Sequence, residues 1–310
     1  GVIFNQPNSD LQMAILLILK HKTHARPKDI SPAAISLLKF EPVLQKVLQR
    51  HLKGQLIKLL NESVLNLTEL PLLLKLMSIC PLADLELEGV LTDIRSGLLC
   101  SISELEGSSE VLCFQSALAL QCFTNEYVYD QTESEGKALE TLEAKISDAL
   151  SDGQQPNPQS ILCLASYKVL HEYEWCDLLS VTSDIKEVFS RQVIEPQKEG
   201  HLKPNIPALE EITDKVSTKV RKQYEESPYP RWVQLKLPFK PDTISEVINE
   251  VNLRLFDNTL NEVEAPNILI AGCGTGQHSI VTAARFKNSR VLAIDLSLSS
   301  LAYAKRKTEE

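Results

Sequence analysis

The sequence predicts a mainly α-helical fold, in which an α-helical N-terminal domain precedes the opening βαβα part of a parallel α/β domain. Glycine is scarce, at 11 of 310 residues, and aromatic residues make up 5% of the chain; this composition favours helix over sheet. Up to about residue 205, apolar residues recur at helical spacing. Two short β-branched runs occur only near the C-terminus, and three glycines follow the first of them. We therefore expect an α-helical domain over 1–223, a proline- and aromatic-rich linker or lid over 224–241, and the partial α/β domain over 242–310.

Composition and charge exclude several functional classes. With a net charge of −9, the chain lacks the broad positive field of non-specific nucleic-acid binders. Nucleic acid is therefore not indicated as a partner. No apolar stretch approaches the ~20 residues that span a bilayer, and no basic segment marks a signal peptide; we expect no membrane association. The seven cysteines form no CxxC pair and predict reduced core thiols and a cytoplasmic location. No metal site is predicted, because the cluster His171 to Asp177 would spread over different faces of one helix.

The N-terminal helices are predicted from caps, breaks and periodicity. Ser31 and Pro32 predict a cap and first residue of a helix, and Val111–Phe123 predicts a buried helix. Leu139, Leu142, Ile146 and Leu150 mark an amphipathic helix that ends near Asp152-Gly153. The last helix of the region is marked by Leu209, Ile212, Val216 and Val220, after Pro207. No internal repeat is present, and the tetratricopeptide signature is absent.

The segment from Tyr224 to Pro238 is predicted to be extended, because its prolines exclude continuous helix. It concentrates Tyr224, Tyr229, Arg231 and Trp232. It is either a stiff interdomain linker, which is the favoured interpretation, or a lid over a ligand site in which Arg231 meets a carboxylate. Thr243 and Glu246 then form a capping box that starts the next helix.

The C-terminal segment has the order strand, glycine turn, helix, strand, acid. The run 267–271 predicts a buried parallel strand, and the turn Gly272-Cys273-Gly274-Thr275-Gly276-Gln277 leads into a helix over about 278–286. A second strand over 290–294 ends at Asp295, and Leu298, Leu301, Ala302 and Lys305 mark a final helix. This order is typical of the opening of a nucleotide-type α/β fold.

The glycine spacing separates two classes of ligand. Glycines let the backbone approach a bound adenosyl group closely, and an acid at the end of the second strand accepts hydrogen bonds from ribose hydroxyls. A dinucleotide site of the form G-x-G-x-x-G needs glycine at 277, where this chain has Gln277. The observed G-x-G-x-G favours S-adenosylmethionine, which has no pyrophosphate. A dehydrogenase, which would bind a dinucleotide, is therefore disfavoured.

These motifs resemble those of class I S-adenosylmethionine-dependent methyltransferases, which have a Rossmann-like domain. Residues 268–277 resemble the first motif of that family, residues 291–297 its second motif, and residues 300–305 the helix that follows. More narrowly, residues 123–129 and 224–232 resemble segments of bacterial two-part proteins. Those proteins join a long helical N-terminal region, sometimes described as tetratricopeptide, to such a methyltransferase domain.

The resemblance implies a cofactor and its contacts, although the catalytic residues stay unknown. S-Adenosylmethionine is the expected cofactor. Ile270 stands where many class I enzymes carry an acid that helps to hold the methionine end of the cofactor, and Arg231 is a candidate substitute. Cys273 is expected as a small apolar residue of the turn, not as a nucleophile. The expected cofactor-binding residues are Gly272, Cys273, Gly274, Gly276, Gln277, Asp295, Leu296 and Arg231.

The expected function is methyl transfer from S-adenosylmethionine to an acceptor that the sequence does not identify. Two strands are fewer than a doubly wound sheet needs, so we expect a C-terminally truncated methyltransferase that is not competent alone. We expect its last ~45 residues to be loosely packed, to borrow packing from the helical domain, or to pair with another chain. The alternative is a helical protein-interaction scaffold with a vestigial or incomplete nucleotide-binding domain. Under either hypothesis, the helical domain is a possible binding surface for a protein partner.

Overall fold

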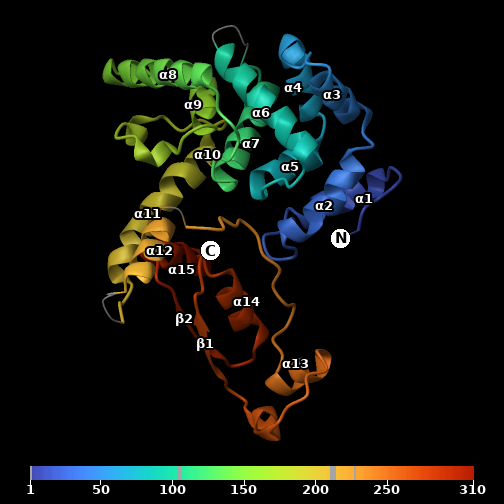
Figure 1. The fold of residues 1–310 in the computed structure, drawn as a ribbon, viewed down its shortest axis with the longest axis vertical. Coiled ribbons are helices and arrows are strands. Elements are labelled where there is room, and N and C mark those ends of the chain that lie inside the picture. Colours follow the sequence, from blue (N-terminus) through green and yellow to red (C-terminus); the bar gives the residue numbers. More distant parts are fainter. Residues whose placement is uncertain (1, 103–106, 210–213, 227) are drawn as a thin grey trace. The chain divides into compact units, whose positions relative to one another are not determined.

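The computed structural model describes residues 2–102, 107–209, 214–226 and 228–310 (Figure 1). By its internal contacts the chain forms two compact units. The first contains residues 1–21 and 25–197, and the second contains residues 22–24 and 198–310. Residues 198–223, which we expected within the helical domain, thus pack in the second unit. The division of function at residues 223 and 241 stays a proposal.

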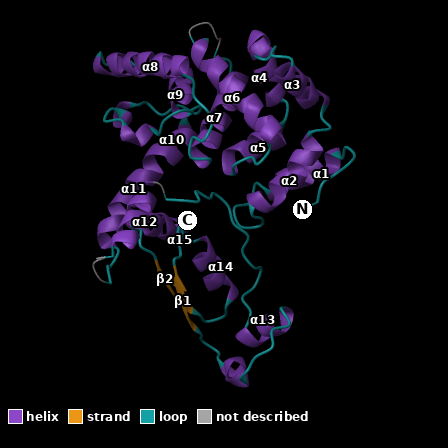
Figure 2. Ribbon diagram, viewed as in Figure 1, coloured by secondary structure: helices purple, strands orange, loops and turns teal. Residues whose placement is uncertain are grey.

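The described part of the first unit is built from helices (Figure 2). Their bounds are α1 Ser9–Ile18, α2 Pro27–Leu38, α3 Pro42–Leu52, α4 Leu60–Thr68, α5 Pro71–Ile79, α6 Leu85–Cys100, α7 Ser109–Thr124, α8 Glu133–Ser151, α9 Pro158–Ala165 and α10 Lys186–Phe189, with short 3-10 turns at Ile57–Leu59, Leu170–Glu172 and Cys176–Leu178 and a π-helical turn at Ser190–Ile194. None of the helices in the described ranges combines the length and apolar character needed to cross a membrane.

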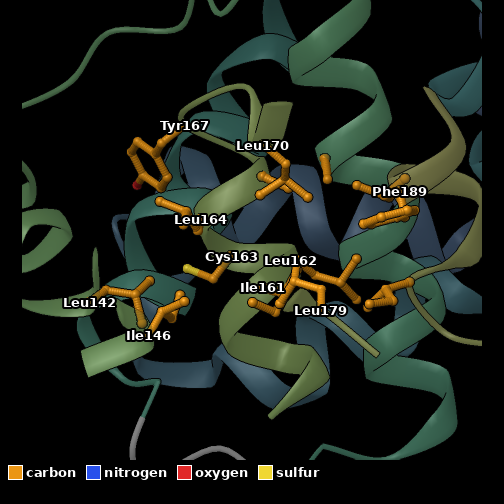
Figure 3. Packing of buried hydrophobic residues seen from close by; sticks show 14 of the residues in the cluster. Leu142, Ile146, Ile161, Leu162, Cys163, Leu164, Tyr167, Leu170, Leu179 and Phe189 are labelled. Atoms are coloured by element: carbon orange, nitrogen blue, oxygen red, sulfur yellow. The ribbon is translucent and has the colours of Figure 1, made fainter. Parts of the chain in front are cut away.

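Helix α7 lies in the core of this unit, as its apolar sequence predicts. It packs against α4, α5 and α9, and residues from Phe114 to Thr124 are buried on nearly all sides. Helix α8 adds the predicted stripe of Leu139, Leu142, Ile146 and Leu150. Figure 3 shows Leu142 and Ile146 of this stripe close to Ile161 and Cys163 of α9. One apolar cluster therefore joins the end of α6 to α7, α8, α9 and α10.

A buried charged group lies beside that cluster. The Arg95 guanidinium lies 4.2 Å from the centre of the Tyr167 ring and donates to the backbone oxygen of Asp130 at 2.6 Å. The Tyr167 hydroxyl donates to Glu135 at 2.6 Å, and Glu135 closes a capping box with Thr132 at the start of α8. Because a buried charge is costly unless it is paired, these contacts explain how Arg95 is accommodated.

The second unit carries the strands. Its elements are α11 Glu195–Leu202, which crosses the boundary between the units, α12 Lys215–Glu226, α13 Ile244–Glu250, β1 Asn267–Ala271, α14 Gln277–Arg285, β2 Arg290–Ile294 and α15 Leu298–Glu309, with 3-10 turns at Lys203–Asn205 and Asn258–Glu262. β1 and β2 pair in parallel, with Asn267 opposite Arg290 and Ala271 opposite Ile294. Both strands have the bounds expected from the sequence. A small core of Trp232, Leu235 and Tyr303 packs against α14.

The prediction that the first strand is buried is wrong. Only Ile270 of β1 is buried, and the paired residues Leu269 and Leu292 are each 61% exposed. In the described residues the sheet has two strands, so no third strand or second helical layer covers this face.

Four local predictions are also wrong. Helix α2 begins at Pro27, which takes the first helical position, so Ser31 and Pro32 lie inside the helix. The cluster from His171 to Asp177 contains two 3-10 turns in place of one helix. The chain is helical to Glu226, so Tyr224 is not extended. Of the cysteines, Cys100 and Cys113 are exposed, and the other five are buried.

The helix expected after Pro207 begins only at Lys215. Its predicted apolar residues Val216 and Val220 are exposed, and Ile212 lies outside the described residues. The capping box of Thr243 and Glu246 is confirmed at the start of α13.

Candidate functional site

The glycine turn joins the end of β1 to α14. Gly272, Gly274 and Gly276 have φ values of +71°, +53° and +82°, which side-chain-bearing residues rarely adopt. The N–H groups of Gly272 and Cys273 both donate to the backbone oxygen of Ile294, at 2.8 and 3.0 Å. The turn is therefore fixed to the last residue of β2.

The three glycines differ in what surrounds them. A Cβ at Gly272 would meet no atom within 4 Å, and one at Gly274 would have only the backbone oxygen of Tyr229 at 4.0 Å. A Cβ at Gly276 would lie 2.5 Å from the Cβ of Ala304 in α15. The first two glycines thus leave open space beside the backbone, whereas the third allows α14 and α15 to approach.

Asp295 follows β2 and holds the glycine turn. Its Oδ2 accepts from the N–H of Gly274 at 2.7 Å, and its Oδ1 accepts from the N–H of Ser297 at 3.0 Å. An ionised carboxylate has about four lone-pair sites, so each oxygen retains capacity for a further donor. The side chain can therefore order the turn and still accept two hydroxyl groups.

A cavity of about 800 Å³ opens beside Gly272, Gly274 and Asp295, entirely within the second unit. Apolar side chains form most of its lining, and Arg221 and Asp295 are its charged residues. The lining residues are Ile206, Pro207, Ala208, Leu209, Val220, Arg221, Tyr224, Tyr229, Gly272, Gly274, Leu292, Ala293, Ile294, Asp295, Leu296, Leu298, Ser300 and Leu301.

The aromatic segment that follows α12 packs on the glycine turn. The Thr275 hydroxyl donates to the backbone oxygen of Pro230 at 2.9 Å, and the indole N–H of Trp232 donates to the backbone oxygen of Thr275 at 3.0 Å. The Tyr303 hydroxyl of α15 donates to the backbone oxygen of Trp232 at 2.5 Å. Because Tyr229 also lines the cavity, this segment borders the cavity; its role as a linker or as a lid stays a proposal.

Helix α12 also borders the cavity and is attached to α15. The Glu225 carboxylate accepts from the N–H groups of Leu298 and Ser299 in the first turn of α15. The Ser299 hydroxyl donates to Glu225 Oε2 at 2.7 Å, and the Ser297 hydroxyl donates to the backbone oxygen of Tyr224 at 3.0 Å. A carboxylate at a helix N-terminus satisfies free N–H groups and complements the helix dipole.

The structure brings together half of the residues predicted to bind a cofactor. Gly272, Gly274, Asp295 and Leu296 line the cavity. Cys273, Gly276, Gln277 and Arg231 are not among the lining residues. Burial, and then the charge of Asp295, raise the pKa of the Cys273 thiol, which fits the expected packing role.

Arg231 does not line the cavity, whereas Arg221, which was not predicted from the sequence, does. The charge of Arg231 acts on Glu199 of α11, whereas Arg221 of α12 lines the cavity. The sequence offered a weak signal for Arg221, since it stands four residues before Glu225 and so shares a helix face with it. Within the described ranges, no three His, Cys, Asp or Glu side chains gather as metal ligands.

Comparison with known proteins finds a similarity at the C-terminal end of the chain. Residues 268–310 match a family model described as a methyltransferase domain. No significant match was found among curated proteins or among solved structures. The matched residues include β1, the glycine turn, β2, Asp295 and α15. Residues 268–310 of this mainly helical chain are therefore similar to a methyltransferase domain.

Proposed function

We propose that the second unit binds S-adenosylmethionine and forms the cofactor-binding part of a methyltransferase. The observation that carries the proposal is the open face of Gly272 and Gly274 beside the Asp295 carboxylate. A ligand can approach the backbone there without meeting a Cβ. Free lone pairs of Asp295 then meet the ribose hydroxyls. When bound, the cofactor supplies an electrophilic methyl group on a sulfonium, and the chain's part is to hold and orient it.

The proposal is tested by calorimetric titration of this chain with S-adenosylmethionine and with S-adenosylhomocysteine. Asp295→Ala should weaken binding of both compounds about 10- to 100-fold, because it removes charge-assisted hydrogen bonds and loosens the Gly274 backbone. Asp257→Ala is the matched control, since Asp257 is an exposed acid of the same unit that does not line the cavity. Unchanged affinity in Asp295→Ala would show that the ribose assignment is wrong.

We also propose that this chain alone does not transfer methyl groups. The described sheet has two strands, while in this fold class acceptor-side residues generally come from later strand ends. The acceptor and the catalytic residues are therefore not assigned. Measurable turnover by this chain with any acceptor would contradict this part of the proposal.

A scaffold function is not favoured, because the family match falls on the glycine turn and Asp295. A cytoplasmic location, a bacterial two-part architecture and a protein partner for the helical unit remain proposals. The first rests on the cysteine pattern, the second on the resemblance of residues 123–129 and 224–232, and the third on the size of the helical unit.

A further inference from the structure

Two charged side chains of opposite sign line the cavity. Asp295 follows β2, and Arg221 lies on α12. The other lining residues contribute apolar groups, backbone, two tyrosines and a serine. A ligand that fills this cavity therefore meets a hydrogen-bond acceptor at Asp295 and a fixed cation at Arg221, which favours a molecule with hydroxyls and an anionic group.

The position of Arg221 is set by the contacts of its helix. The Arg221 Nε lies 4.0 Å from Glu225 Oε1, one helical turn along α12. Glu225 in turn accepts from the first N–H groups of α15, and α15 begins three residues after Asp295. Arg221 and Asp295 are thus both linked to the start of α15, Arg221 through its ion pair with Glu225 and Asp295 through the hydrogen bond from the Ser297 N–H.

Among the residues that line the cavity, Arg221 alone carries a positive charge that could pair with an anionic group of the ligand. Ile270 cannot hold the methionine end of the cofactor, and Arg231 does not line the cavity. Arg221 has the planar guanidinium that pairs with a carboxylate through two parallel hydrogen bonds. We propose that Arg221 binds the carboxylate of the methionine part of S-adenosylmethionine, an assignment that rests on the proposed cofactor function.

The test compares two ligands that differ in this carboxylate. S-Adenosylhomocysteine carries the amino-acid end, whereas 5′-methylthioadenosine keeps the adenosine and sulfur but lacks it. Calorimetric titration of the chain should show that Arg221→Ala weakens S-adenosylhomocysteine about 10- to 100-fold and leaves 5′-methylthioadenosine within twofold. Arg221→Lys should recover only part of the loss, because an ammonium does not form the paired contact. Lys222→Ala is the matched control, since Lys222 is an exposed cation of the same helix that does not line the cavity, and it should change neither affinity.

Three other outcomes would each overturn the assignment of Arg221 to the carboxylate, and they can be told apart. Equal weakening of both ligands in Arg221→Ala would mean that the residue supports the fold of the site and does not bind the carboxylate. Unchanged binding of S-adenosylhomocysteine would exclude the contact, while the cofactor function would stand. Binding of neither ligand to the unsubstituted chain would overturn the proposed function itself, and the role of Arg221 with it.

Discussion

Each glycine of the turn has a different physical reason to lack a side chain. Gly272 and Gly274 face the cavity, so a Cβ there would occupy the space of a ligand more than that of the protein. Gly276 faces Ala304, so a Cβ there would press α14 away from α15. The motif therefore combines two cavity-facing positions with one packing position, and substitutions should separate the two roles.

The change Gly276→Ala should destabilise the second unit by about 2–5 kcal/mol. The left-handed backbone costs about 1–2 kcal/mol for a residue with a Cβ, and overpacking against Ala304 adds about 1–3 kcal/mol. Gly272→Ala is the control, because its Cβ meets no atom and only the backbone cost remains. Urea unfolding followed by Trp232 fluorescence measures both. Equal losses in the two variants would contradict the packing role of Gly276.

Cys273 should behave as a packed, unreactive thiol. It is 8% exposed, and its raised pKa keeps the thiolate scarce near neutral pH. Iodoacetamide at pH 8, followed by peptide mass spectrometry, should label the exposed Cys100 and Cys113 well before Cys273. Cys273→Ala should leave the affinity for S-adenosylhomocysteine within twofold. Fast labelling of Cys273 in the folded chain would contradict its burial.

The sequence was informative about the site wherever a residue is fixed by local backbone chemistry. The glycines and Asp295 could be predicted because a strand, a turn and a second strand fix their mutual position. The basic residue could not, since Arg231 and Arg221 lie in adjoining segments and only tertiary packing decides which one reaches the cavity. Asp295 was expected to face a ligand, and its two backbone hydrogen bonds were not foreseen.

At the scale of elements, Glu225 is the main link between α12 and α15. Glu225→Gln should destabilise the second unit by about 1–2 kcal/mol, because the amide loses the negative charge at the helix terminus and replaces one acceptor oxygen with a donor. Unfolding in urea, followed by Trp232 fluorescence, gives the free energy. Glu226→Gln is the control, since Glu226 is exposed on the same helix. If both variants lose equally, the cap does not hold α15.

The elements that the sequence predicted best are those with strong local boundaries. β1 and β2 lie between prolines, glycines or acids, and their predicted bounds match the structure. The start of α2 was missed because two prolines compete for the first helical position, and Pro27 takes it. The exposed faces of Val216 and Leu269 could not be predicted, because amphipathic patterns assume a covering layer that the described residues do not supply.

At the scale of the whole chain, each unit contains one tryptophan and, among its described residues, one buried carboxylate whose pKa is shifted. Trp175 and Glu135 belong to the first unit, and Trp232 and Glu199 to the second. Burial opposes ionisation of Glu135, but hydrogen bonds from Tyr167 and Thr132 and the charge of Arg95 outweigh it, so its pKa is lowered. For Glu199, burial dominates over Arg306 and raises the pKa. The two units should therefore respond to pH in opposite ways.

The first unit should lose stability as the pH falls below about 4.5, the ordinary value for glutamate. A lowered pKa means that the ionised form stabilises the fold, and this contribution disappears as the pH falls through the folded-state pKa. Glu135→Gln should cost about 2 kcal/mol at pH 7 and reduce this acid loss, to which Glu62 and Glu110, whose pKa values are also lowered, contribute as well. A Trp232→Phe chain, in which Trp175 is the remaining tryptophan, reports the first unit during urea unfolding. An unchanged acid profile in Glu135→Gln would contradict the assignment.

The second unit should instead lose stability as the pH rises from about 5.5 towards neutral. Because the pKa of Glu199 is raised, the folded unit binds more protons than the unfolded chain in this range, and the slope of the unfolding free energy with pH is negative. One proton limits that slope to about 1.4 kcal/mol per pH unit. The acids of this unit with lowered pKa values, Asp214, Glu246, Asp257 and Glu310, contribute below that range.

In a Trp175→Phe chain, Trp232 fluorescence should show this negative slope. Glu199→Gln should abolish the slope, while the control Glu226→Gln should preserve it. A slope that survives in Glu199→Gln would mean that another group carries the pH dependence.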